Sequence, residues 1–431
     1  MLQPVCRRLV AAGVIVIVLQ FAWAEIAGAM PAFARTYGVS CTTCHSAFPR
    51  LSPVGELFAD DWNFRMPNWE EKTVNLGDDR LRLPSQLPLG LRAQAFVQGR
   101  DGEAIDPLTG DVTADSTADI QAPYLIKLLS SAPLSDQISF YFYAILAEKG
   151  QNTEIVVEDA WFSYGDLFDT GVGMQLGQFQ ISDVMFPREV RLTFQDFMLY
   201  RMAGITYERG VLLGRSFGPV DVDLGFVNGN GIDANASINS PGFRRADRLF
   251  DNDTSKTVFA RLGTDLGGVS VGLFALSGEQ RNAVGPAGTQ TGDRDTDKRI
   301  VGVDFAGQVD SDKFWFAQAL WNEWDGFLDP SQSYKWHGAF AGIDWVRSEL
   351  WTHSLLYNYA DADDLANTDT VFEGIDISSL TFSSSYYFMR NVKGVIEMNL
   401  DLLSTDSQTG QFFTGHLSRE HYVLLGFDAA F

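Results

Sequence analysis

Apolar and polar residues alternate along most of the chain after residue 88. Near the C-terminal end, for example, Ile396, Met398 and Leu400 alternate with Glu397 and Asn399. A period of two is typical of a β-strand with one apolar and one polar face. Many of these segments have about ten residues or more, which is the length that a tilted strand needs to cross a membrane. The pattern favours a membrane barrel, although a soluble β-sandwich would alternate in the same way.

The alternation predicts about 16 strands, whose boundaries are soft by a few residues. Connections after even-numbered strands are short, and those after odd-numbered strands are mostly long, with residues 151–153 as the exception. Outer-membrane barrels have the same asymmetry between periplasmic turns and external loops. We therefore expect an all-β fold for residues 85–431, a transmembrane antiparallel barrel of about 16 strands with both chain termini in the periplasm. The predicted strands are residues 88–99, 120–132, 137–149, 155–165, 171–181, 202–214, 219–229, 256–266, 269–279, 297–308, 313–325, 334–347, 350–361, 378–390, 393–404 and 421–431.

Residues 1–29 have the features of a secretory signal peptide. Arg7 and Arg8 precede an apolar run from Leu9 to Ala24, and small residues suited to cleavage follow up to Ala29. A single anchoring helix is the alternative, but the run is shorter than the roughly 20 apolar residues that a span needs. Export with cleavage would remove Cys6 and leave a mature chain with two cysteines.

The composition narrows the range of partners. The 431 residues carry a formal net charge of −23, and this acidic balance argues against a nucleic acid as partner. The same charge suits a surface that attracts cations or stays solvated. The chain also has 32 Phe beside 40 Gly, and aromatic residues spread over many short segments fit a large β-barrel better than a helical protein.

The two remaining cysteines, Cys41 and Cys44, precede His45 in a Cys-x-x-Cys-His pattern, which indicates covalent attachment of a c-type haem. Two thiols three positions apart lie on one turn and can bond to the two vinyl groups of a haem, and the adjacent histidine then reaches the iron as proximal ligand. A structural disulfide is an alternative in an exported protein. A zinc site would want four ligands, and a thioredoxin-type pair would need a βαβ context that this sequence lacks. We therefore predict one haem c.

Met66 is the candidate for the sixth iron ligand, because it follows His45 closely along the chain. Phe58 and Trp62 lie between them and are placed to wall the haem. Ligation by a thioether would raise the reduction potential, and the alternative is that Met66 only packs. The other histidines of the mature chain would reach the haem only if the haem enters the strand region; they are His337, His353, His416 and His421.

Two kinds of connection carry further chemistry. Residues 101–119 hold six carboxylates and no Lys or Arg, and a smaller acidic group stands at residues 361–364. Such loops are either a solvated exterior or a field that concentrates cations such as Fe(II). The connection at residues 182–201 mixes aromatic residues with Arg188 and Arg191. It either folds inward and narrows the lumen, or contacts haem propionates through its arginines, or is an ordinary external loop.

The region from Met30 to Met66 resembles the N-terminus of the fused monohaem cytochrome–porins. The best-known members of that family are outer-membrane iron oxidases of iron-oxidising bacteria. The resemblance rests on MPAFARTYGVSCTTCH at residues 30–45, LSPVG at residues 51–55 and FRM at residues 64–66. Over the rest of the chain the resemblance is architectural, although residues 177–191 also look similar.

The resemblance implies a monohaem cytochrome c segment at residues 30–80. Cys41 and Cys44 would hold the haem covalently, His45 would be its proximal axial ligand, and Met66 falls where the short haem segment of that family ends. Iron as the electron donor is implied by the resemblance alone, because nothing in the spacing of these residues indicates it.

We therefore expect an electron conduit through the bacterial outer membrane, in contact with outer-membrane lipid. An external donor, Fe(II) by the resemblance, would reduce the haem, and a periplasmic cytochrome or other carrier would take the electron away. The chain would then act like an Fe(II):cytochrome c oxidoreductase. The alternative is a solute porin whose haem-bearing segment serves as a plug or redox sensor, and a third interpretation is a porin whose two cysteines only form a disulfide.

Overall fold

The computed structural model of the chain describes most of the sequence from residue 32 onward. The predicted signal peptide at residues 1–29 lies outside the described residues, as do Trp62, His416 and most of residues 102–116. None of the helices in the described part is long and apolar enough to cross a membrane. The described residues are 32–60, 63–68, 70, 73–75, 77–78, 82–85, 87–101, 104–105, 112–114, 117–148, 155–188, 198–229, 232, 254, 256–284, 290–366, 368, 376–389, 391–403 and 421–431.

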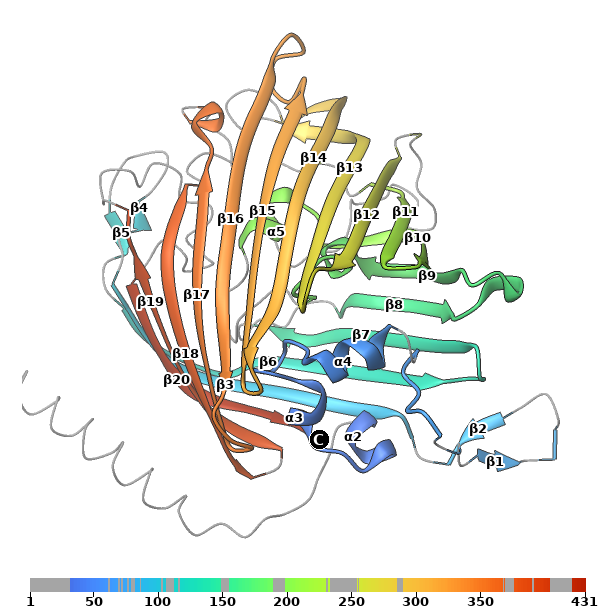
Figure 1. Cartoon of the computed structure of the whole chain (residues 1–431). Coiled ribbons are helices and arrows are strands. Elements are labelled where there is room, and N and C mark those ends of the chain that lie inside the picture. Colours follow the sequence, from blue (N-terminus) through green and yellow to red (C-terminus); the bar gives the residue numbers. More distant parts are fainter. Residues whose placement is uncertain are drawn as a thin grey trace, which may run out of the picture.

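Within these residues, sixteen antiparallel strands form one closed barrel (Figure 1). The strands are β3 Leu89–Asp101, β6 Thr117–Pro133, β7 Ile138–Glu148, β8 Val156–Tyr164, β9 Gly173–Gln180, β10 Tyr207–Phe217, β11 Val220–Val227, β12 Thr257–Asp265, β13 Val269–Val284, β14 Gln290–Asp310, β15 Lys313–Asp325, β16 Ser333–Val346, β17 Trp351–Asp361, β18 Ile377–Met389, β19 Val392–Asp401 and β20 His421–Ala430. Each pairs with the barrel strand before and after it, and the barrel closes where β20 pairs with β3.

Every predicted strand overlaps one observed barrel strand, and the prediction for residues 313–325 matches β15 at both ends. Three strand ends were clearly wrong. The strand expected from residue 202 begins at Tyr207, because Met198–Ala203 form the helix α5. The long connection expected between residues 280 and 296 is mostly strand, since β13 runs to Val284 and β14 starts at Gln290.

Short turns gather at one end of the barrel and longer connections at the other, as the sequence predicted. The short-turn end holds residues 134–137 and 347–350, together with the turn that contains η2 (Leu167–Asp169). The opposite end holds the hairpin of β4 (Ala104–Ile105) and β5 (Val112–Ala114), and η5 (Asp363–Leu365). Because β3 starts and β20 ends at the short-turn end, the chain enters and leaves the barrel on the same side.

The wall carries apolar side chains outward and many polar side chains inward. In β20, Val423, Leu425 and Phe427 point outward and are 49%, 45% and 40% exposed, whereas Tyr422 and Asp428 are buried on the lumen side. Large apolar side chains are exposed in the same way on most other strands. An outer face of this kind is costly in water and suits a hydrocarbon surrounding.

The connection between β9 and β10 folds into the barrel, which confirms one of the predictions for residues 182–201 in the part that is described. It contains η3 (Ile181–Val184) and α5, with residues 189–197 outside the described chain. Met185 and Tyr200 are fully buried, and the Tyr200 ring meets Phe340 of β16 edge-on at a centroid distance of 5.3 Å. Inward apolar residues of β12 to β18 pack with this connection, so an apolar core lies inside the barrel.

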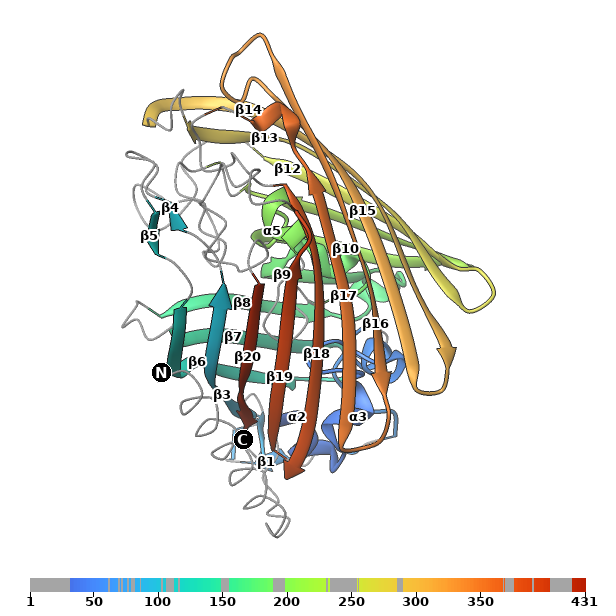
Figure 2. The ribbon, with the colours of Figure 1, turned by 90° about the vertical axis from the view of Figure 1, so that its left-hand side faces the viewer.

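The N-terminal segment, residues 32–66, lies inside the barrel at the short-turn end. Its helices are α2 (Ala32–Tyr37), α3 (Cys41–Cys44) and α4 (Pro53–Ala59), and a hairpin of β1 (Thr73–Asn75) and β2 (Arg82–Pro84) follows before β3. Figures 1 and 2 both show α2 and α3 near the end of the barrel where the C-terminal end of the chain lies.

Candidate functional site

The Cys-x-x-Cys-His pattern lies on α3 and the residue after it. The helix is a single turn, and the His45 N–H donates to the carbonyl of Cys41 over 2.9 Å, so the three residues are held together. Cys41 and Cys44 are free thiols rather than a disulfide, and both line the lumen. Burial raises the pKa of both thiols, which keeps them protonated near neutral pH.

His45 is held by a backbone contact at one ring nitrogen. Its Nδ1 lies 2.8 Å from the carbonyl oxygen of Pro49 and donates to it when Nδ1 carries the proton. That tautomer leaves Nε2 with a lone pair, as a metal ligand requires. Burial lowers the pKa of His45 to about 4, so the imidazole is neutral at neutral pH. An edge contact with Phe48, at a centroid distance of 4.6 Å, also restrains the ring.

A close approach between α3 and α4 fixes the orientation of the motif. Ser52 is the N-cap of α4, where its hydroxyl accepts from the Gly55 N–H and its own N–H donates to the Cys44 carbonyl over 2.9 Å. A Cβ at residue 55 would lie 2.0 Å from that same carbonyl oxygen, so the contact requires glycine.

A buried ion pair anchors the N-terminal segment to the barrel wall. Arg50 is 1% exposed and donates to both carboxylate oxygens of Asp344 in β16, with Nε 2.7 Å from Oδ2. Its Nη2 also donates to Ser354 of β17 over 2.7 Å, and Ser46 donates to Asp344 over 3.0 Å. A bidentate pair fixes position as well as charge. This anchor was not predicted, because in the sequence Asp344 is only a polar residue at an inward strand position.

Aromatic rings join the N-terminal segment to β7 and β8. Phe64 is 7% exposed and packs on Tyr141 and Trp161 at centroid distances of 5.8 and 5.6 Å. Behind it, Phe33 and Phe58 lie 5.4 and 5.7 Å from the Phe64 ring. Phe58, which the sequence placed as a wall of the haem, therefore belongs to a small aromatic core and also lines the lumen cavity.

Charged barrel residues lie beside the motif, at the seam where β20 meets β3. Arg92 of β3 donates to Asp428 of β20 from Nε over 3.0 Å and from Nη2 over 2.7 Å. Lys393 of β19 lies 3.7 Å from the same carboxylate and donates to the Phe48 carbonyl over 3.1 Å. Lys393 and Asp428 are also near enough to Cys41 for their charges to act on its thiol. This group was not predicted, since Arg92 lies over 300 residues before Lys393 and Asp428 along the chain.

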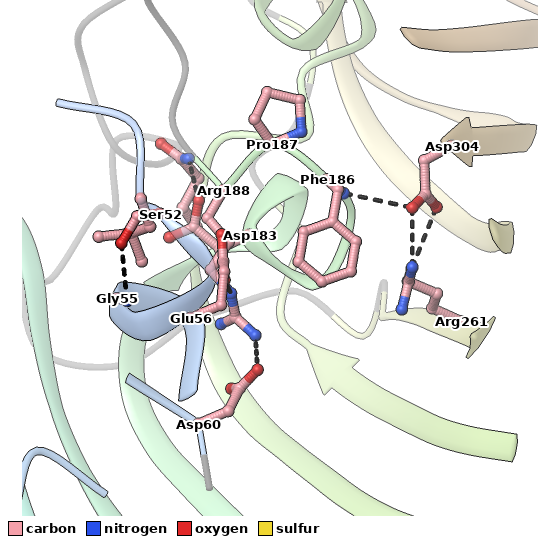
Figure 3. A network of polar contacts seen from close by, with 12 residues as sticks. Ser52, Gly55, Glu56, Asp60, Asp183, Phe186, Pro187, Arg188, Arg261 and Asp304 are labelled. Carbon is pink, nitrogen blue, oxygen red and sulfur yellow. Dashed lines mark hydrogen bonds and ion pairs between the residues drawn. The ribbon is translucent and has the colours of Figure 1, made fainter. Parts of the chain in front are cut away.

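A second buried pair fixes the base of the inward connection. Asp304 of β14 accepts from Arg261 of β12 over 3.0 and 2.7 Å, and from the Phe186 N–H over 3.3 Å (Figure 3). The Arg261 guanidinium carbon lies 5.0 Å from the centre of the Phe186 ring.

The inward connection also holds the N-terminal segment. Arg188 forms ion pairs with Glu56 of α4 and with Asp60 just beyond it, as Figure 3 shows. The sequence offered haem propionates as partners for Arg188 and Arg191. Arg188 instead pairs with carboxylates of the chain itself, and Arg191 lies outside the described residues.

These elements border one lumen cavity of about 1150 Å³. Cys41, Cys44 and His45 line it from the N-terminal segment, and Lys393 and Tyr387 line it from the wall. The donor set fits a c-type haem: two thiols lie on one helical turn, and the Pro49 carbonyl engages Nδ1 of the adjacent imidazole. Among the described residues, no three His, Cys, Asp or Glu side chains gather as a separate metal site.

Met66 stays a prediction as sixth ligand. It is half-buried and follows Arg65, which pairs with Asp136 in the turn after β6, and it is not among the described residues that line the cavity. Two histidines of the barrel wall, His337 and His353, lie on its outer face and not toward the cavity. His337 is exposed outside β16, and His353 lies between outer aromatic rings, including Trp351 at 5.8 Å.

The acidic connections are described only in part. Asp363 and Asp364 belong to η5, and Asp364 accepts from the Lys335 N–H over 2.8 Å, so this group is tied to β16. The four acidic residues between 102 and 116 all lie outside the described residues, and the cation-attracting field expected from them stays a prediction.

Comparison with known proteins identifies the fold of the chain. No protein-family profile matches it, and no curated protein does so either. Among solved structures, the outer membrane channel DcaP of Acinetobacter baumannii is similar with a TM-score of 0.52 and 13% identity, over 80% of this chain and 97% of that one. The anion-selective porin from Comamonas acidovorans gives 0.52 and 12%, over 80% and 99% of the two chains. The OmpF of Salmonella typhi, in a complex with daunomycin, gives 0.52 and 12%, over 84% and 100%. The chain therefore has the sixteen-stranded barrel fold of outer-membrane porins.

Proposed function

We propose that this chain is an outer-membrane barrel that carries one haem c inside its lumen and passes electrons from an external donor to a periplasmic carrier. The observation that carries the proposal is the placement of Cys41, Cys44 and His45. The two thiols share one helical turn, the Pro49 carbonyl engages Nδ1 of the histidine, and all three residues line a cavity inside a closed barrel.

The outer face of the barrel supports a membrane location. Exposed apolar residues such as those of β20 would contact lipid, and the strands have the length that a tilted crossing needs. We place the short-turn end in the periplasm, where barrels of this class have their short turns. Both chain termini and the N-terminal segment would then face the periplasm, within reach of a periplasmic cytochrome.

The chain's own residues would hold and tune the cofactor. Cys41 and Cys44 would bond to it covalently, His45 would bind the iron through Nε2, and the Pro49 carbonyl would orient the imidazole. Met66 is the proposed sixth ligand. When bound, the haem supplies reversible one-electron transfer, so no bond-making step is required of the protein.

Carboxylates of the cavity favour a small cationic donor. Asp183, Asp221 and Asp223 line the cavity, and carboxylates facing a narrow aqueous space raise the local concentration of cations. Aqueous Fe(II) is small and suits weak oxygen ligands. We therefore propose Fe(II) as the donor, in line with the family that residues 30–66 resemble.

The first test is whether the purified protein contains haem c. A pyridine haemochrome spectrum should show one c-type haem per chain in the parent protein and none in Cys44→Ala. Thr43→Ala, on the same turn, is the matched control and should keep its haem. Adding Fe(II) to intact cells should then reduce the haem of the parent protein. A haem that stays oxidised would contradict the iron assignment.

A solute porin with a haem-bearing plug is the second candidate. The ion pairs of Arg188 with Glu56 and Asp60 favour it, because they tie the inward connection to the N-terminal segment within the lumen. Conductance in planar bilayers separates the two functions. An electron conduit should give little ionic current, and Fe(II) should reduce its haem. A solute porin should give a large ionic current, and Fe(II) should leave its haem oxidised.

A further inference from the structure

The seam between β3, β19 and β20 carries more positive than negative charge in a buried place. Arg92, Lys393 and Asp428 are 5%, 3% and 4% exposed, and a single carboxylate lies between the two cations. Arg50, a further cation in this region, is already matched by Asp344. Burying a charge is costly unless an opposite charge accompanies it. The three seam residues therefore carry one more positive than negative charge.

The same seam borders the cavity next to the haem-attachment motif. Lys393, Arg92 and Asp428 line the cavity together with Cys41 and Cys44. Phe48 connects the two groups, since its carbonyl accepts from Lys393 and its ring lies 4.6 Å from the Arg92 guanidinium carbon. An anion that belongs to a ligand attached at the two cysteines would thus meet the seam cations.

We propose that Lys393, supported by Arg92, is the positioning residue that pairs with a carboxylate of the haem. The inference rests on the proposed function and adds to it that the barrel wall, and not only the N-terminal segment, builds the haem site. A c-type haem brings two propionates, and a carboxylate beside Lys393 would match the seam's excess charge. The arginine that the sequence suggested for this role, Arg188, is instead paired with Glu56 and Asp60.

The test compares Lys393→Met with Lys393→Arg in the purified, haem-loaded protein. In Lys393→Met the propionate bending band of the resonance Raman spectrum should shift, and the reduction potential should fall, because a lost positive charge favours ferric haem. A tenfold change in the equilibrium constant for haem reduction is expected, on the order of 59 mV for one electron. Lys393→Arg should restore both readouts.

Lys298→Met is the matched control, because Lys298 is also a buried lumen lysine but donates to the Gly204 carbonyl. It should leave the Raman band and the potential unchanged. If Lys393→Met fails to fold, Lys393→Gln replaces it and should shift the propionate band and lower the potential in the same way.

The outcomes separate the two proposals. An absence of haem from the parent protein would overturn the proposed function and this inference with it. Haem that is present, with a propionate band unmoved by Lys393→Met, would overturn the inference alone. A potential that shifts without any change in that band would also overturn it, because a nearby charge that does not pair with the propionate gives that result.

Discussion

The Arg50–Asp344 pair is expected to hold the N-terminal segment in the barrel, and Arg50→Met tests this directly. The substitution keeps most of the side-chain volume but leaves the Asp344 carboxylate, 1% exposed, without its main partner. Breaking a buried pair in this way costs about 3–5 kcal/mol, which corresponds to a roughly 10²- to 4 × 10³-fold increase in local opening. Hydrogen exchange in detergent micelles measures it at the Ser46 and Ser52 amides, which are bonded inside the segment.

Arg65→Met is the matched control, because Arg65 also pairs with the barrel, through Asp136. Both partners of that pair are partly exposed, with side chains 33% and 84% accessible, and exposed pairs contribute about 0–1 kcal/mol. Exchange should therefore rise about fivefold or less. The double variant Arg50→Met/Asp344→Leu should regain much of the protection, since no buried charge is left alone. Equal exchange in the Arg50 and Arg65 variants would refute the reasoning.

Three further outcomes are expected. Gly55→Ala should lower the amount of covalently bound haem, since its Cβ would lie 2.0 Å from the Cys44 carbonyl oxygen. Gly99→Ala has open space for its Cβ and should keep its haem. Equal haem content in the two variants would contradict the packing argument. Met66→Ala should lower the reduction potential and remove the sulfur-to-iron charge-transfer band, and an unchanged absorption spectrum would rule out ligation. Arg188→Gln should raise the frequency of channel openings in planar bilayers by a few-fold, because its two partly exposed ion pairs contribute about 1 kcal/mol together. An unchanged opening frequency would show that the pairs do not restrict the lumen.

The barrel was predictable because its signal is local and repeated. Alternation such as that of Ile396, Met398 and Leu400 depends only on which face of a strand meets the apolar surrounding, so each strand carries its own evidence. The boundary at residue 202 failed for a physical reason. Met198–Ala203 are as apolar as a strand, but they pack as a helix against β16 and β17 inside the lumen.

The candidate site was predictable only where its chemistry is contiguous in sequence. Cys41, Cys44 and His45 form one motif, and the motif alone indicates haem attachment. The Pro49 carbonyl on His45 and the anchor of Arg50 on Asp344 depend on how the chain returns on itself, which no local pattern encodes. A polar residue at an inward strand position is the only sequence signal that Asp344 gives.

The seating of the N-terminal segment inside the closed wall has a consequence for the order of assembly. Phe48 is joined to Lys393 across 345 positions, and Arg50 to Asp344 across 294, so its resting place exists only after the last strands are formed. Contacts of such long sequence separation form late, because the loop they close must be ordered first. The N-terminal segment is synthesised before the barrel strands but is among the last parts to reach its final position, and Cys41 and Cys44 stay accessible to solvent until the barrel closes around them.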